Sequence, residues 1–116
     1  MTTTNNTTLT NEYSISDYQS TPSGYYQITF RGDGEIVVVT QTGRGGCNYY
    51  SPSPRPASFD KWLADNAHLA IAFYRRLGDG FTWLVPAIEN RENEWEDYVV
   101  MAICDMIDLR LITVRG

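Results

Sequence analysis

Residues that usually build catalytic and metal sites are scarce in this sequence, which has one histidine and two cysteines among 116 residues. His68 has no second histidine or carboxylate partner at a spacing typical of a zinc site or a catalytic triad. Cys47 and Cys104 have neither close-pair metal spacing nor the cysteine density of a secreted disulfide scaffold, so reduced thiols are expected. These shortages predict a protein without a metal, a cofactor or an enzymatic activity.

Long apolar runs are also missing. The N-terminal stretch MTTTNNTTLTNEYS is polar and has neither the basic region nor the apolar core of a signal peptide. No uninterrupted apolar run approaches the length of a membrane-spanning helix. We therefore expect a soluble, cytoplasmic protein with no membrane partner.

Lysine is nearly absent, since Lys61 is the only one and the other eight of the nine basic residues are arginine. The formal net charge of -5 argues against long nucleic acid as a partner, because such binding gains its affinity from excess Lys and Arg. Arginine, however, presents a planar fork that suits phosphate and carboxylate groups. The balance favours a phosphate-bearing small molecule over a long polyanion.

Length and composition fit one folded domain. A chain of this length can bury a single modest core, and 42% of its residues are hydrophobic. Residues 1–11 are mostly Thr and Asn and hold too little apolar surface to offset the entropy of ordering them. We predict a flexible polar tail over 1–11 and a single domain over 12–116.

The first part of the domain has the alternation typical of β-strands. In EYSISDY, Tyr13, Ile15 and Asp17 recur at the period of a half-buried strand. The run YYQITF places three side chains on one face of an extended chain: Tyr26, Ile28 and Phe30. The Asp-Gly pair in RGDGE indicates a hairpin leading into EIVVVTQT, which is rich in β-branched residues. An antiparallel meander is therefore predicted from Tyr13 to about Thr42.

A long helix is predicted over residues 59–77, with Ser58 as its N-cap and Gly78 as its stop. Its apolar residues recur at helical spacing: Phe59, Trp62, Leu63, Ala67, Ala70, Tyr74 and Leu77. An alternative interpretation ends the helix at Asn66 and makes HLAIAFYRR and FTWLVPA a hairpin around GDG.

A second helix is predicted in WEDYVVMAICDMIDL, with Trp95, Val99, Ala102, Ile103 and Met106 on one face. FTWLV before it is interpreted as a short strand or extended segment ended by Pro86. The acidic stretch ENRENEWED fits the positive end of the helix dipole better than a catalytic carboxylate pair. RLITVRG either frays or forms a short edge strand. A sheet followed by two helices makes the predicted fold α+β.

The glycine-rich segment after the meander is a candidate anion site. Gly43, Arg44, Gly45 and Gly46 can turn successive backbone N–H groups into one concavity, as a phosphate-binding nest does. The segment lacks the Lys-Ser/Thr ending of a Walker A loop, and Cys47 has no base at hand. A simple connecting loop is the equally weighted alternative.

Other candidate ligand-binding residues lie towards the C-terminus. Arg110 and Arg115 can clamp a phosphate, and Phe81 after GDG can stack on a base at a pocket rim. Asn93 and Asn90 carry amides that can contact a base or a ribose. The remaining aromatic residues have core spacing, and exposed surface positions are the alternative for each arginine.

The order of these parts resembles the phage Thoeris anti-defence proteins of the first type, on the segments GDGF, ENRENE and DLRLITVRG. The resemblance implies a homo-oligomer that captures cyclic ADP-ribose signals without chemistry. It implies that Phe81 stacks on the ligand, that Asn93 or Asn90 contacts it, and that Arg110 and Arg115 hold its phosphates. It also implies a second site, for cyclic oligonucleotides, at GRGG.

The leading hypothesis is thus a non-catalytic sponge for cyclic nucleotide immune signals. The runner-up is an acidic protein-binding inhibitor of an immune nuclease, and the third is a small structural assembly protein. An enzyme has the least support, because no catalytic set of residues is assembled.

Overall fold

Four strands form a single antiparallel sheet at the N-terminal end of the chain. The computed structural model describes residues 9–10, 13–21, 24–32, 34–42, 46–50 and 55–114. The strands are β1 (Ser14–Ser20), β2 (Tyr26–Gly32), β3 (Glu35–Thr42) and β4 (Gly46–Tyr50), paired in chain order. The predicted meander is confirmed, and the fold class is the predicted α+β.

Strand β4 was not predicted, because the glycines around Arg44 indicated a loop through residues 43–50. Gly46 instead begins β4 and pairs with Thr42, so β3 and β4 run antiparallel. An extended β-branched strand such as β3 presents unpaired backbone groups along its edge. Pairing with β4 satisfies them regardless of the side chains that β4 carries.

A β-bulge in β1 corrects the predicted alternation. Ile15 pairs with Phe30 and Asp17 with Thr29, so Ser16 is the extra residue. Beyond the bulge, each side chain of β1 lies on the opposite face of the sheet from the one that strict alternation predicts. Asp17 is therefore exposed, and Tyr18, paired with Ile28, turns towards the helices. The prediction that Asp17 shares a face with Tyr13 and Ile15 is wrong.

Helix α1 (Ala57–Leu77) confirms the long predicted helix, and the alternative hairpin is wrong. Its N-cap is Pro56, not Ser58, and no side chain caps the first turn. Proline suits a helix start because it has no N–H to leave unpaired. Ser58 lies inside the first turn, where its hydroxyl donates to the Glu35 carboxylate at 2.8 Å. Gly78 ends the helix with a φ of 96°.

The predicted FTWLV strand is wrong, because this segment is helical. A 3-10 turn over Asp79–Phe81 leads into the short helix α2 (Leu84–Glu89). Pro86 lies in the first turn of α2, where backbone N–H groups have no partner within the helix, so it does not break it. Buried Leu84, Val85, Ala87 and Ile88 hold α2 in place.

Helix α3 (Trp95–Asp108) confirms the second predicted helix. Residues 109–114 form no strand, and Ile112 among them is buried, so this segment packs on the core and does not fray. No helix within the described residues is long and apolar enough to cross a bilayer.

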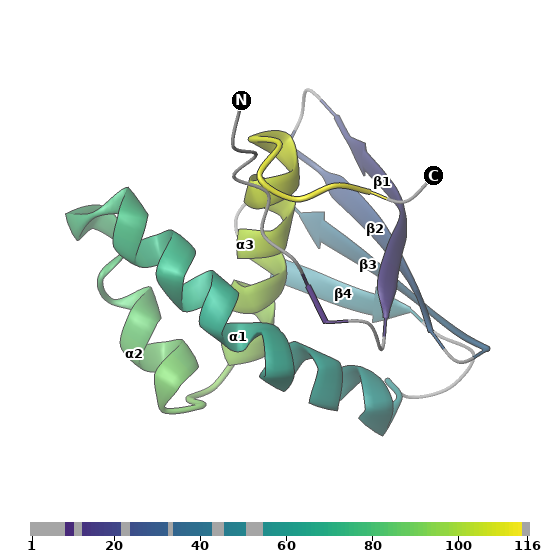
Figure 1. Cartoon of the computed structure of the whole chain (residues 1–116), viewed down its shortest axis with the longest axis horizontal. Helices are drawn as coiled ribbons and strands as arrows, with labels where there is room; N and C mark the ends of the chain where they lie inside the picture. The colour runs from purple at the N-terminus through teal and green to yellow at the C-terminus, as the bar shows by residue number, and fades with distance from the viewer. Residues whose placement is uncertain are drawn as a thin grey trace, which may run out of the picture.

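Figure 1 shows α1 and α3 on one side of the sheet, with α2 packed against the other two helices and away from the strands. The core between sheet and helices is aromatic: Phe30 lies 5.0 Å from Phe59 and 5.1 Å from Trp62, measured between ring centroids. The result is a compact single domain. Its two long helices are held on the sheet, while the short α2 leaves a groove beside α3.

Leu9 and Thr10 belong to the segment expected to be a tail, and both contact the domain. Leu9 packs against the core. The Thr10 backbone N–H donates to Asn66 Oδ1 at 3.0 Å, and Trp62 Nε1 donates to the Thr10 carbonyl at 3.2 Å. Residues 1–8 and 11–12 lie outside the described part of the chain.

Candidate functional site

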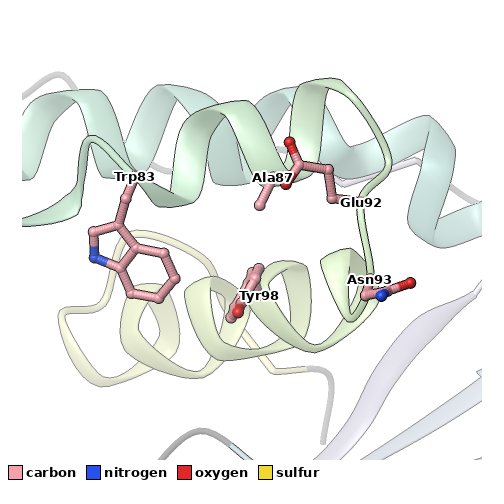
Figure 2. Close-up of a pocket in the computed structure, with 5 residues that line it drawn as sticks. All are labelled: Trp83, Ala87, Glu92, Asn93 and Tyr98. Carbon is pink, nitrogen blue, oxygen red and sulfur yellow. The ribbon is translucent and has the colours of Figure 1, made fainter.

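The candidate site is a groove between α2 and α3 with a volume of about 490 Å³. Figure 2 shows the five residues that line it: Trp83, Ala87, Glu92, Asn93 and Tyr98. We call it the α2–α3 groove. It combines two aromatic side chains with two polar ones, a composition common in binding pockets.

Trp83 is the most exposed large hydrophobic residue of the described chain, with 61% of its surface accessible. It is the residue that precedes α2, and its indole stands perpendicular to the Tyr98 ring, with centroids 5.5 Å apart and planes at 85°. Tyr98 is itself held in place, since the Tyr74 hydroxyl donates to its carbonyl at 3.0 Å. The groove wall is thus anchored to α1, while the Trp83 ring stays open to solvent.

The turn that joins α2 to α3 presents Glu92 and Asn93. It contains two of the three non-glycine residues with positive φ in the described chain, Arg91 at 54° and Glu94 at 69°. The Glu92 N–H donates to the Ala87 carbonyl at 2.9 Å and so holds the turn against α2. Left-handed backbone at residues other than glycine costs free energy and often marks a functional segment.

The groove carries a carboxylate at the end away from Trp83. Figure 2 shows the Glu92 carboxylate turned towards Ala87 and the Asn93 amide turned away from Trp83. No arginine or lysine is among the described residues that line the groove. Arg91, next to Glu92 in sequence, instead lies over the Trp95 ring, 4.3 Å from its centroid. The groove therefore offers hydrogen-bond acceptors and an aromatic surface, and it favours cations and N–H donors.

The structure places only Asn93 of the predicted site residues in this groove. Phe81 stacks on Tyr74 with centroids 5.7 Å apart and planes at 12°, and it does not line the groove. Arg110 lies beyond the end of α3 with a φ of 62°, and its N–H donates to Ile107 O at 2.9 Å. Asn90 caps α2 and is also outside the lining. Phe81, Arg110 and Asn90 therefore lie outside the described lining of the α2–α3 groove.

The remaining predicted residues belong to the glycine-rich segment and to the C-terminus. Gly46 is the first residue of β4 and pairs with Thr42. Gly43, Arg44, Gly45 and Arg115 lie outside the described residues, so the nest and the second phosphate clamp stay predictions.

Sequence reasoning missed Trp83, Tyr98 and Glu92. The spacing of the aromatic residues predicted a core position for Trp83, and the helix dipole accounted for Glu92. The available signal was helical periodicity over residues 83–89: Leu84, Val85, Ala87 and Ile88 form the buried face. Trp83 and Pro86, three residues apart, fall on the opposite face.

A second polar cluster joins the sheet to the end of α3. The Tyr18 hydroxyl donates to Asp108 Oδ1 at 2.8 Å, and its ring stacks on Tyr26 with centroids 5.9 Å apart. Burial raises the pKa of Tyr18, and the hydrogen bond to Asp108 raises it further. Burial also raises the pKa of the Asp105 carboxyl, and the Asp108 charge adds to the shift. The polar groups of this cluster contact one another, and the Tyr18–Asp108 hydrogen bond joins β1 to the end of α3.

The single histidine and the later cysteine lie on two different helices, α1 and α3. His68 is exposed, with Nδ1 3.0 Å from the Asp65 carbonyl one turn back. Cys104 is buried in α3. Across the residues that the structure describes, no three His, Cys, Asp or Glu side chains lie close enough together to hold a metal ion.

The chain matches no protein-family model, no curated protein and no solved structure. The functional argument therefore rests on the chemistry of the α2–α3 groove.

Proposed function

We propose that this chain is a non-catalytic binding protein that docks a basic protein partner through the α2–α3 groove. The partner class is the cationic, nucleic-acid-binding face of an immune nuclease in the host cytosol, which the acidic chain would block. The observation that carries the proposal is the α2–α3 groove, which has the open Trp83 ring at one end and the Glu92 carboxylate at the other.

Exposed aromatic residues support a protein partner. Tryptophan, tyrosine and arginine contribute most of the binding energy in many protein interfaces, and they cluster at the interface centre. Trp83 and Tyr98 lie together in the groove, and Leu77 and Phe81 add exposed apolar surface in the segment just before it. A free protein gains nothing by exposing an indole to water, whereas a partner that covers it recovers the burial energy.

Charge supports a basic partner over an anionic one. The turn beside the groove carries exposed carboxylates at Glu89, Glu92 and Glu94, and within the described part of the chain Glu89 pairs with Arg75 at 2.9 Å. The whole chain has a formal net charge of -5. Such a field steers a cationic partner and speeds its association at low salt.

The second candidate is the cyclic-nucleotide sponge that the resemblance implies. The open Trp83 ring favours it, since a base stacked on an aromatic side chain contributes about 1–3 kcal/mol. Asn93 at the groove edge carries an amide that can contact the base. The phosphates would need arginines from outside the described lining, and assembly into a homo-oligomer with pockets between protomers stays a prediction.

One binding assay separates the two candidates. Dye-labelled protamine stands in for a basic nucleic-acid-binding face, and cyclic ADP-ribose isomers and cyclic di-AMP stand in for the signals. We expect protamine binding that weakens as salt rises and is lost in Trp83→Ala. Binding should be kept in Tyr25→Ala, which removes an exposed aromatic residue just before β2.

The second candidate would be favoured if the protein binds a cyclic nucleotide tightly, loses that binding in Trp83→Ala and does not bind protamine. Heat denaturation of the complex and recovery of the nucleotide then test for chemistry. Intact nucleotide indicates sequestration, and altered nucleotide indicates an enzyme. If neither probe binds, both candidates fail.

A further inference from the structure

We infer that the partner places two neighbouring side chains in the α2–α3 groove, an aromatic one against the Trp83 ring and a cationic one at the Glu92 carboxylate. The inference rests on the proposed function and adds the pattern of residues that the partner must present. It follows from the change in chemistry along the groove, which is apolar at one end and acidic at the other.

The two ends of the groove are separated along α2. Figure 2 shows Trp83 at one end, Ala87 and Tyr98 in the middle, and Glu92 and Asn93 at the other end. Trp83 has helical backbone angles and precedes Ala87 by four residues, which is about 6 Å along a helix. Glu92 lies beyond Ala87 and donates its N–H to the Ala87 carbonyl at 2.9 Å. A side chain that covers Trp83 therefore leaves the carboxylate to a second side chain.

The Trp83 end suits an aromatic side chain. The Trp83 ring is 61% accessible, and the perpendicular contact with Tyr98, at a centroid distance of 5.5 Å, sets its orientation. Tyr98 is tied to α1, because the Tyr74 hydroxyl donates to its carbonyl at 3.0 Å. Ala87 adds only a methyl group to this part of the lining. An aromatic ring placed here buries apolar surface and gains the further stabilisation of ring-to-ring contacts.

The Glu92 end suits a cation. The Glu92 side chain is exposed, and Figure 2 shows its carboxylate turned towards Ala87 and so towards the middle of the groove. Glu94, in the same turn, is a second exposed carboxylate. The described lining of the groove includes no arginine or lysine that would compete for Glu92. A cationic side chain that enters beside the covered Trp83 ring therefore meets a complementary charge.

The distance between the two ends sets the spacing in the partner. In an extended chain, alternate residues point to the same side and lie about 7 Å apart, close to one helical turn. A partner segment with an aromatic residue, any residue and then a basic residue can therefore reach both ends. A segment with two arginines has the same spacing and one more positive charge, but it places a charged group, not a neutral ring, against Trp83. General charge attraction favours the two-arginine segment, whereas a two-ended groove favours the mixed one.

The test compares two acetylated and amidated pentapeptides, Gly-Phe-Gly-Arg-Gly and Gly-Arg-Gly-Arg-Gly. Titrations are followed by the backbone N–H resonance of Ala87 in the middle of the groove, at about 0.15 M salt, where distant charges are screened. We expect the phenylalanine peptide to bind about two- to threefold more tightly, although it carries one positive charge fewer, because its ring packs on Trp83.

Changes made on both sides of the contact assign each side chain to one end. Replacing the peptide arginine by citrulline keeps its shape and removes its charge, and it should weaken binding about two- to fivefold in the wild type but not in Glu92→Gln. Replacing the peptide phenylalanine by alanine should weaken binding about two- to tenfold in the wild type but not in Trp83→Ala. The matched controls, Asp17→Asn and Tyr25→Ala, change an exposed carboxylate and an exposed aromatic residue elsewhere, and they should keep both losses in full.

The contrary outcomes separate this inference from the proposed function. Tighter binding of the two-arginine peptide would overturn the inference, and so would a citrulline loss that persists in Glu92→Gln. Binding of protamine that depends on Trp83, without binding of either pentapeptide, would also overturn the inference and leave the basic-partner proposal standing. Absence of protamine binding would overturn the proposed function itself. Two-dimensional spectra of every variant confirm that it is folded.

Discussion

Two tryptophans in this chain have opposite surroundings. Trp62 in α1 is 0% exposed and lies against Phe30 and Phe59 beneath the sheet. Trp83 before α2 is 61% exposed and touches one tyrosine edge-on. The first region uses aromatic surface to hold the fold together, and the second leaves the same kind of surface available for binding.

The difference comes from the number of elements that meet at each place. Around Trp62, the sheet, α1 and the segment at Thr10 all converge, and the Trp62 indole N–H donates to the Thr10 carbonyl. Near Trp83, the short helix α2 packs on α1 and α3, and the outer face of α2 is open to solvent (Figure 1). Aromatic content alone therefore does not distinguish a buried core residue from an exposed one.

The largest expected effect contrasts the two tryptophans directly. Trp62→Ala should lower the free energy of unfolding by about 3–5 kcal/mol, because it leaves a cavity among buried rings. Trp83→Ala should change it by less than about 0.5 kcal/mol, as exposed substitutions do. Urea unfolding followed by circular dichroism measures both. Similar losses in the two variants would contradict the division into a core region and a binding region.

A smaller effect is expected from Asn66, which ties Thr10 to the core region. Asn66 is 1% exposed, and its amide donates to Thr10 Oγ1 at 2.9 Å and to the Trp62 carbonyl at 2.8 Å. Asn66→Ala removes the hydrogen bonds of this buried amide to Thr10 and to the Trp62 carbonyl, and it should cost about 1–3 kcal/mol. The neighbouring exposed Asp65→Ala serves as the control and should cost less than about 1 kcal/mol. Equal costs would mean that the Thr10 contact contributes nothing to the core.

Glycine substitutions test whether the turn beside the groove is strained. Glu94 has a φ of 69°, which glycine adopts without cost, so Glu94→Gly should raise the free energy of unfolding by about 0.4–1 kcal/mol. Arg110→Gly, at a φ of 62° outside the groove, should give a similar gain. Only Glu94→Gly should weaken protamine binding, because it removes a carboxylate from the turn beside the groove. A loss of stability in both variants would contradict the strain interpretation.

The smallest effect concerns pH and compares two carboxylates. The folded pKa of Asp105 is raised by burial and by Asp108, so its contribution to stability is present at low pH and is lost as pH rises through that pKa. The pKa of Glu35 is lowered by hydrogen bonds from Ser58 and Tyr13, so its contribution is present above its ordinary pKa and is lost as pH falls. Asp105→Asn should therefore raise the melting temperature slightly at neutral pH, and Glu35→Gln should lower it. Melting curves between pH 3 and pH 8, an interval spanning both groups' ordinary pKa values of about 4, check the opposite signs.

Most of the architecture could be predicted from local patterns. The alternation in residues 26–30 and the Asp-Gly turn indicated β2 and β3 correctly, because Ile28 and Phe30 face a core that only one side of the sheet contacts. The helical spacing of Trp62, Leu63 and Tyr74 likewise predicted α1. Long periodic segments are reliable because many residues support one interpretation.

The errors fall where a neighbouring element, not the local sequence, decides the structure. Strand β4 forms because the edge of β3 needs a partner, and the bulge at Ser16 turns Tyr18 towards Asp108. Helix α2 forms because its four buried residues find α1 and α3, although its sequence contains Pro86. The α2–α3 groove exists because residues 84–89 form a helix. The sequence spacing of Trp83 and Glu92 therefore could not show that both residues line one groove.

The sequence by itself determined the α+β class, the long helices and the acidic character of the chain, because these depend on periodicity and composition, which are local quantities. Tertiary structure alone decided which aromatic residues are buried and which line a groove together with a carboxylate. Both properties depend on how much of α1 and α3 is covered by the six-residue helix α2. A groove between two helices is a relation between segments, and it exists only once they have packed.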